Sequence, residues 1–145
     1  MKITWFNELK QGTQDEQDHD SCFKDSGAEA ELDAMLSEWN KRYTKKALSQ
    51  EDIIFFHAIF NKISPFYCAN GRISRFITLK QCLQNGTNLL FIDESYAASY
   101  EQALEYEGES AQYYLTNIFR ANSVLLDKRL QPYKEALQYA EEKEN

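Results

Sequence analysis

Two segments with helical periodicity enclose a short, turn-rich stretch, and this arrangement constrains the fold more than any other feature of the sequence. The segments cover residues 49–63 and 71–83, and apolar side chains recur in both at the three- and four-residue spacing of an amphipathic helix. Between them, Pro65 disfavours helical geometry at Ser64, so the first helix should end there. The sequence therefore predicts two helices joined by a tight loop. The face that the second helix should turn to the core consists of Ile73, Phe76, Ile77, Lys80 and Leu83.

The start of the second helix has the residue types that bind anions. Asn70 is a favourable N-cap, and Gly71 lets the backbone approach a ligand closely. The first turn of a helix offers unpaired N–H groups at the positive end of its dipole. Arg72 and Arg75, three residues apart, present two guanidinium groups on the same face. This pattern predicts a cradle for a polyphosphate; the alternative is a capped surface helix whose arginines pair with nearby Asp or Glu.

The stretch over residues 64–75 resembles the signature of Fic-domain proteins, His-x-Phe-x-Asp/Glu-Gly-Asn-Gly-Arg-x-x-Arg. This chain reads Ser-Pro-Phe-Tyr-Cys-Ala-Asn-Gly-Arg-Ile-Ser-Arg there. The five signature residues that it keeps are Phe66, Asn70, Gly71, Arg72 and Arg75. The three that differ are Ser64 in place of the His, Cys68 in place of the acidic residue and Ala69 in place of the first Gly. The resemblance thus covers the phosphate-binding half of the motif and lacks the catalytic half.

Other parts of the chain resemble the same family in the expected order. His57 lies seven residues before Ser64, where Fic helices often carry a structural His, and residues 100–104 match a Tyr-x-x-Ala-Leu pattern that follows the signature. An amphipathic helix over 28–43 looks like the helix that precedes this region in the family. The resemblance implies an all-α, Fic-type helical domain of about six helices around a central helix-loop-helix, with a small N-terminal β-hairpin flap.

A length of 145 residues fits one domain with a single core. We expect one Fic-like domain over 1–145. Its parts are a flap and loop region over 1–27, a helical core over 28–130 and a C-terminal helix over 131–145. Residues 2–6 favour a short strand. The remaining helices are expected over about 93–105, over about 110–130 and from Pro132 onward.

Charge and cysteine content bound the partners and the compartment. The 16 basic and 23 acidic residues give a net charge of −7, which argues against a general nucleic-acid or anionic-membrane binder. No apolar run reaches the length of about 20 residues that a membrane helix needs. The cysteines at 22, 68 and 82 match neither a disulfide framework nor a zinc pattern. The expected location is the cytoplasm, or a host-cell cytosol into which the protein is delivered.

The resemblance also implies a chemistry. Active Fic enzymes transfer a nucleotide monophosphate, usually AMP from ATP, to a protein hydroxyl. Their His acts as base, their acidic residue holds Mg²⁺, and their Asn and Arg residues bind the phosphates. Mapped onto this chain, the nucleotide- or phosphate-binding residues are Asn70, Gly71, Arg72 and Arg75. Ser64 occupies the catalytic position, and Phe66, Cys68 and Ala69 complete the motif loop.

The catalytic half of the motif is replaced by residues with the wrong chemistry. Ser64 has no proton acceptor near neutral pH, and a positioned base contributes about 10²–10⁴ in rate. Cys68 is a poor ligand for Mg²⁺, which prefers oxygen, and no other metal site is predicted. The hypothesis is a degenerate Fic-domain protein that still binds ATP or another nucleotide.

Such a protein would act on a protein target or regulatory partner, as a homo- or heterodimer. Two alternatives stay open. One is a divergent active nucleotidyl- or phosphotransferase, and the other is a helical protein-interaction domain without a ligand.

Overall fold

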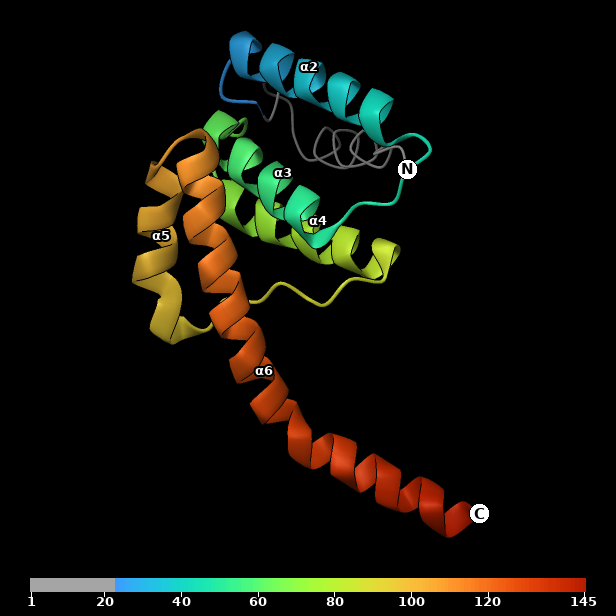
Figure 1. Cartoon of the computed structure of the whole chain (residues 1–145). Coiled ribbons are helices and arrows are strands. Elements are labelled where there is room, and N and C mark those ends of the chain that lie inside the picture. The colour runs from blue at the N-terminus through green and yellow to red at the C-terminus, as the bar shows by residue number, and fades with distance from the viewer. Residues whose placement is uncertain (1–22) are drawn as a thin grey trace, which may run out of the picture. The chain divides into compact units, whose positions relative to one another are not determined.

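The computed structural model describes residues 23–145, and in this range the protein is all-α, as the sequence predicted. The chain divides into two compact units, one up to Thr87 and one from Asn88, which are described separately. The predicted β-hairpin flap and the strand over 2–6 lie outside the described residues, and a single domain over the whole chain stays a prediction. The elements are α2 (Ser26–Tyr43), α3 (Gln50–Ile63), α4 (Asn70–Asn85), the 3₁₀ helix η1 (Glu94–Tyr96), α5 (Ala97–Glu105) and α6 (Gly108–Glu144) (Figure 1).

α2 begins two residues before the predicted start because Asp25 caps it. The Asp25 carboxylate accepts a hydrogen bond from the Ala28 N–H at 2.6 Å, which satisfies one of the unpaired donors of the first turn. One apolar stripe of α2 is buried, as the periodicity predicted. It consists of Ala28, Leu32, Leu36, Trp39 and Tyr43.

α3 starts and ends where the sequence predicted. Ser49 and Asp52 form a capping box, in which each side chain accepts a hydrogen bond from the backbone N–H of the other residue. The Tyr43 hydroxyl donates to Asp52 at 2.5 Å and so joins the end of α2 to the start of α3. Burial alone would raise the pKa of Asp52, but the hydrogen bonds from Tyr43 and Ser49 outweigh it and lower that pKa. The rings of Trp39 and Phe56, 5.0 Å apart, fill the space between the two helices.

α4 packs against α3 through a largely polar face. Its predicted core face is wrong at most positions, because only Ile77 of the five expected residues is buried, whereas Phe76 and Leu83 are 56% and 66% exposed. Hydrophobic periodicity registers apolar side chains only, and it cannot detect a buried face that is made largely of polar side chains. The residues that α4 does bury are Ser74, Ile77, Thr78, Gln81 and Cys82.

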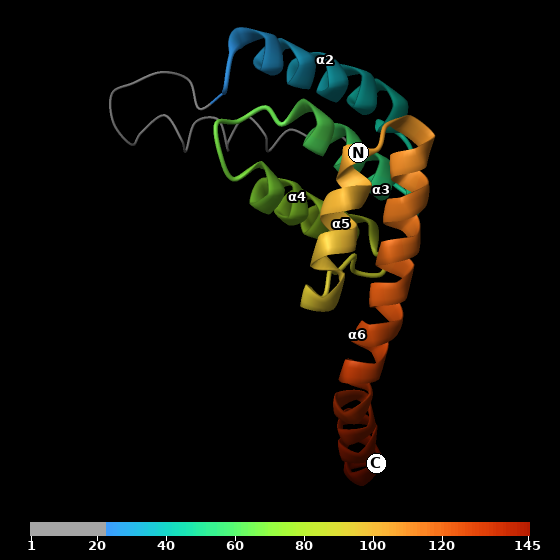
Figure 2. The ribbon, with the colours of Figure 1, turned by 90° about the vertical axis from the view of Figure 1, so that its left-hand side faces the viewer.

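The second unit contains η1, α5 and α6. Asp93 caps η1 by accepting the Ser95 N–H at 3.1 Å, and η1 continues directly into α5, so the predicted helix from Asp93 to about Glu105 is confirmed. α5 and α6 lie side by side (Figures 1 and 2), with the rings of Tyr100 and Phe119 6.5 Å apart between them. The residues that α6 buries are Ala111, Leu115, Phe119 and Asn122.

The predicted helix break at Pro132 is wrong, because α6 continues through this residue to Glu144. A proline inside a helix removes one hydrogen bond and crowds the carbonyl four residues earlier, which bends the helix without always ending it. Figure 1 shows α6 changing direction in its distal half. Residues 131–145 are therefore the end of α6 and not a separate helix. Among residues 23–145, no helix combines the length and apolar character needed to cross a bilayer.

Candidate functional site

The loop over residues 64–69 joins α3 to α4 and holds the first half of the motif (Figure 2). The first and last residues of the loop have left-handed backbone geometry, with φ of 43° at Ser64 and 61° at Ala69. An alanine in this region is strained by about 1–2 kcal/mol, whereas glycine adopts it readily. Ala69 thus occupies a glycine-type conformation at the motif position where the resemblance places a glycine.

Asn70 closes the loop, and its predicted role as N-cap is wrong. Ala69 is the N-cap residue, and Asn70 is the first residue of α4. The Asn70 side chain reaches back to Phe66, accepting from its N–H at 3.0 Å and donating to its carbonyl at 2.9 Å. These two bonds satisfy a backbone donor and a backbone acceptor of an irregular segment, which would otherwise need water. Asn70 therefore fixes the loop shape.

Residues just before α2 anchor the loop from outside. The Phe23 and Phe66 rings stack at 5.2 Å, and these two residues form an isolated antiparallel bridge. The Lys24 N–H donates to the Pro65 carbonyl at 2.8 Å, and the Lys24 ammonium donates to the Ile63 carbonyl at 2.9 Å. Sequence reasoning missed Phe23 and Lys24, because one bridge between distant residues leaves no periodic signal.

The first turn of α4 keeps its positive character. No side chain caps it, and it has no acidic residue. A Cβ at Gly71 would lie 3.1 Å from the Nη1 atom of Arg75, so glycine makes room for the guanidinium over the first turn. Arg72 and Arg75 are exposed, and in the part of the chain that the structure describes neither forms an ion pair with a carboxylate. The predicted alternative, a capped helix with paired arginines, is not what this segment forms.

Polar groups behind the loop hold α3 and α4 together. The Asn61 amide donates to the His57 carbonyl at 2.8 Å and to the Ser74 hydroxyl at 2.9 Å. The Thr78 hydroxyl donates to the Ser74 carbonyl at 2.8 Å, and its oxygen lies 2.8 Å from Nδ1 of His57. Because the single hydroxyl proton is used on Ser74, the network assigns a proton to Nδ1, which donates to Thr78.

His57 is a structural histidine, as the sequence predicted. It is only 1% exposed, and burial lowers its pKa to about 4, with a smaller contribution from the charge of Arg75. A hydrogen bond with the Ser74 backbone opposes this shift without reversing it. The ring is therefore neutral at pH 7 and enclosed between α3 and α4, where it cannot take a proton from a bound substrate.

The two remaining motif positions show what chemistry the loop lacks. The Ser64 hydroxyl donates its proton to the Asn61 carbonyl at 2.5 Å, which ties this side chain to the end of α3. Cys68 is exposed and has a free thiol. Within residues 23–145, no group of three or more His, Cys, Asp or Glu side chains is arranged to hold a metal ion.

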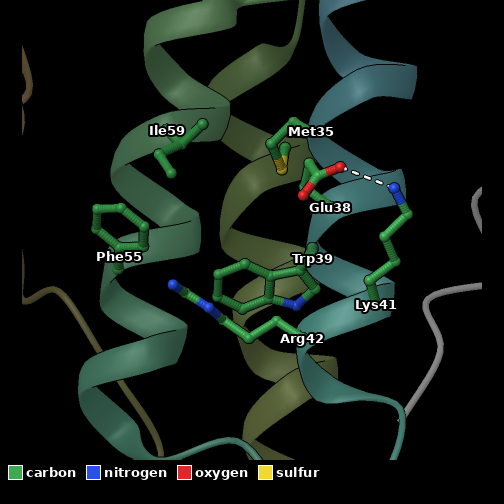
Figure 3. Close-up of a pocket in the computed structure, with 7 residues that line it drawn as sticks. All are labelled: Met35, Glu38, Trp39, Lys41, Arg42, Phe55 and Ile59. Carbon is green, nitrogen blue, oxygen red and sulfur yellow. Dashed lines mark hydrogen bonds and ion pairs between the residues drawn. The ribbon is translucent and has the colours of Figure 1, made fainter.

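A hollow of about 530 Å³ lies elsewhere, between α2 and α3 (Figure 3). In Figure 3 the side chain of Arg42 extends along the Trp39 indole toward α3, while Lys41 pairs with Glu38 at 2.9 Å on the outer side. This hollow is near the end of the helix pair that Tyr43 and Asp52 join, away from the motif loop. The residues that line it are Met35, Glu38, Trp39, Lys41, Arg42, Phe55 and Ile59.

No family model matches this sequence, and no curated protein sequence matches it. The functional assignment therefore depends on the geometry of the loop and on the residues that the motif shares with Fic-domain proteins.

Proposed function

We propose that this chain is a degenerate Fic-like domain, which binds a phosphate-bearing ligand such as ATP or another nucleotide at the start of α4. The observation that carries the proposal is the uncapped first turn of α4 with two exposed arginines that have no carboxylate partner among the described residues. A phosphate group would satisfy the N–H groups of this turn and both guanidinium groups at once.

Two further features of the loop support this function. Ala69 has the backbone geometry that a glycine at its motif position would adopt, and Gly71 admits the Arg75 guanidinium over the helix end. Asn70 fixes the loop through Phe66, so the site does not have to be ordered by its ligand. A preorganised site binds more tightly because less conformational entropy is lost on binding.

The same loop argues against efficient transfer chemistry. Ser64 is already a donor to Asn61 and has no basic group, and His57 is buried with a pKa of about 4. A missing base lowers the rate by about 10²–10⁴. Cys68 offers sulfur where a Mg²⁺ ligand should offer oxygen. The domain would therefore act mainly as a nucleotide-dependent binding module for a protein target or regulatory partner. A reducing cytosol fits the free thiols of Cys68 and Cys82.

Calorimetric titration with ATP tests the binding site. The wild type should bind ATP with nearly the same affinity in the presence and absence of Mg²⁺, since no carboxylate of the loop holds the ion. Arg72→Met and Arg75→Met should each weaken ATP binding by about tenfold, because each removes a charge-assisted hydrogen-bond donor to phosphate. Arg120→Met, which removes an exposed arginine of α6, is the matched control and should bind like wild type. Absence of ATP binding, or equal affinities for all four proteins, would contradict the proposal.

Incubation with labelled ATP and a cell lysate tests the second part separately. We expect no labelled protein bands from a preparation that binds ATP in the titration. Labelled bands that disappear in Arg75→Met would show an active transferase and would overturn the proposed loss of catalysis, while leaving the binding site in place.

A further inference from the structure

The distal part of α6 is a helix with an apolar stripe that no other element of its unit covers. Every residue from Asp127 to Asn145 is exposed, and Tyr133 and Leu137 are 69% and 66% exposed. Beyond the ion pair of Arg129 with Asp93, at 2.7 Å, the described side-chain hydrogen bonds and ion pairs of this segment stay within α6. In Figure 1 α6 extends well past the end of α5.

The apolar residues of this segment follow the spacing of a coiled-coil seam. Leu126, Leu130, Tyr133, Leu137 and Ala140 are separated by four, three, four and three residues. This is the alternation of a and d positions in a heptad repeat, which keeps one narrow stripe facing a partner helix. The stripe continues the face that α6 buries in its own unit through Phe119 and Asn122. Pro132 occupies a c position, on the side of the helix away from the seam.

The distal part of α6 would also be more stable if its apolar stripe packed against a partner helix. Most helical stability in proteins comes from the packing of an amphipathic face, and side-chain pairs along one helix add only about 0.2–0.5 kcal/mol each. The pairs seen here, such as Gln131 with Glu135 and Gln138 with Glu142, are of this weak kind. Burial of Leu130, Tyr133 and Leu137 is what such a helix lacks.

We infer that the distal parts of α6 from two copies of this chain pair as an antiparallel coiled coil. The segment from Asp127 to Asn145 has four basic and five acidic side chains, so two copies meet with little net repulsion although each chain has a net charge of −7. The charges beside the seam select the orientation. Asp127 and Lys134 share one flank, as their 3.6 Å ion pair within α6 shows.

The relative orientation of the two helices follows from which charged residues would face each other beside the seam. In the antiparallel pair that aligns Leu130 with Tyr133 of the second copy, Asp127 faces Lys134 of that copy, and the two-fold symmetry forms this contact twice. In a parallel pair, Arg129 would face Lys134 of the second copy, which places like charges together twice. The antiparallel orientation is therefore the one that the sequence of the flank favours. This inference does not depend on nucleotide binding.

Sedimentation equilibrium across micromolar to millimolar protein tests the pairing. The wild type should rise from the monomer mass of 17.0 kDa toward twice that value as the concentration increases. Leu130→Lys with Leu137→Lys should remain at the monomer mass, because two charges enter the seam. Gln131→Lys with Gln138→Lys is the matched control, with the same two charges added outside the seam on the same helix, and should associate like wild type. A wild type that stays monomeric throughout, or a seam variant that associates as strongly as wild type, overturns the inference.

A single charge reversal tests the orientation. Lys134→Glu should weaken association in the antiparallel pair, because the new carboxylate faces Asp127, and adding Asp127→Lys should restore it. In a parallel pair the same Lys134→Glu change would relieve the repulsion from Arg129 and strengthen association. A strengthened Lys134→Glu dimer would therefore overturn the antiparallel arrangement.

Discussion

The Nδ1 atom of His57 lies 2.8 Å from the hydroxyl oxygen of Thr78, inside the contact between α3 and α4. The Thr78 hydroxyl in turn donates to the Ser74 carbonyl at 2.8 Å. One hydroxyl thus satisfies a buried ring nitrogen of α3 and a backbone carbonyl of its own helix. This link lies between α3 and α4, the two helices that the motif loop joins.

Thr78→Val should destabilise the protein although it preserves side-chain volume. It removes the hydrogen bond that the Thr78 oxygen accepts from Nδ1–H of buried His57, and such a bond contributes about 0.5–1.5 kcal/mol. Urea unfolding followed by circular dichroism measures the loss. Thr116→Val is the matched control, because the Thr116 hydroxyl bonds only the Gln112 carbonyl of its own helix. Equal losses in the two variants would contradict the proposed link.

Stability should fall between pH 6.5 and pH 4 because of His57. The pKa of this group is 6.5 in the unfolded chain and about 4 in the folded protein. In that window the unfolded chain binds a proton that the folded protein does not, so unfolding becomes easier as pH falls. The contribution is complete above pH 6.5 and largely lost near pH 4, with an upper limit of about 3 kcal/mol.

Unfolding free energies at pH 7 and pH 4.5 measure this effect in wild type and in His57→Gln. The wild type should lose more stability than the variant over this interval. Asp52 and Asp93, whose pKa values are lowered, lose their own contributions only below about pH 4 and affect both proteins equally. Identical losses in the two proteins would show that His57 is not the group responsible.

Ala69→Gly should stabilise the protein. The left-handed backbone at Ala69, with φ of 61°, is strained for alanine by about 1–2 kcal/mol, which exceeds the extra entropy of about 0.5–1 kcal/mol that glycine loses on folding. A rise in the unfolding midpoint in urea is expected. Ala98→Gly, at an exposed position of α5, should instead lower stability by about 1 kcal/mol. A loss at both sites would mean that residue 69 is not left-handed in solution.

Asn70→Ala should loosen the loop and weaken ATP binding together. The substitution removes two hydrogen bonds to Phe66, each of which contributes about 0.5–1.5 kcal/mol. Limited proteolysis should show faster cleavage at the exposed Tyr67, and titration should show lower ATP affinity. Asn85→Ala, which removes a side chain that bonds Leu48 and Gln81 at the far end of α4, should leave loop cleavage unchanged. Faster cleavage of the Asn70→Ala loop with unchanged ATP affinity would contradict the prediction, because it would show that ATP binding does not require an ordered loop.

Restoring the two missing motif residues should restore self-modification. Ser64→His with Cys68→Asp supplies a base and an oxygen ligand, and histidine tolerates the left-handed backbone at residue 64 better than most residues. Incubation with labelled ATP and Mg²⁺ should label the double variant, and adding Arg75→Met should abolish the label. A double variant that folds and binds ATP yet remains unlabelled would contradict the roles assigned to these positions.

Local signals in the sequence were enough for most helix boundaries. The Ser49–Asp52 box and the left-handed Gly86 at the end of α4 act within a few residues, so their effects can be inferred from sequence. The inner face of α4 could not be inferred in this way. It is buried through Ser74 and Thr78, whose partners Asn61 and His57 come from another helix.

For the candidate site too, neighbouring residues could be predicted from the sequence and contacts between distant residues could not. Four residues of the candidate site lie within six positions of one another, so the sequence alone was enough to place them at one helix start. They are Asn70, Gly71, Arg72 and Arg75. In the structure both arginines are exposed there. The predicted role of Asn70 was wrong, because the sequence does not distinguish an asparagine that caps the helix from one whose side chain turns back to Phe66. The anchoring by Lys24, 39 residues from Ile63, had no sequence signal at all.

Phe23 and Lys24 bind the loop from its outer side and lead directly into α2. The segment that precedes α2 and the loop that precedes α4 are thereby in direct contact. A change that displaces residues 23–25 would therefore also remove contacts of the loop that precedes Arg72 and Arg75.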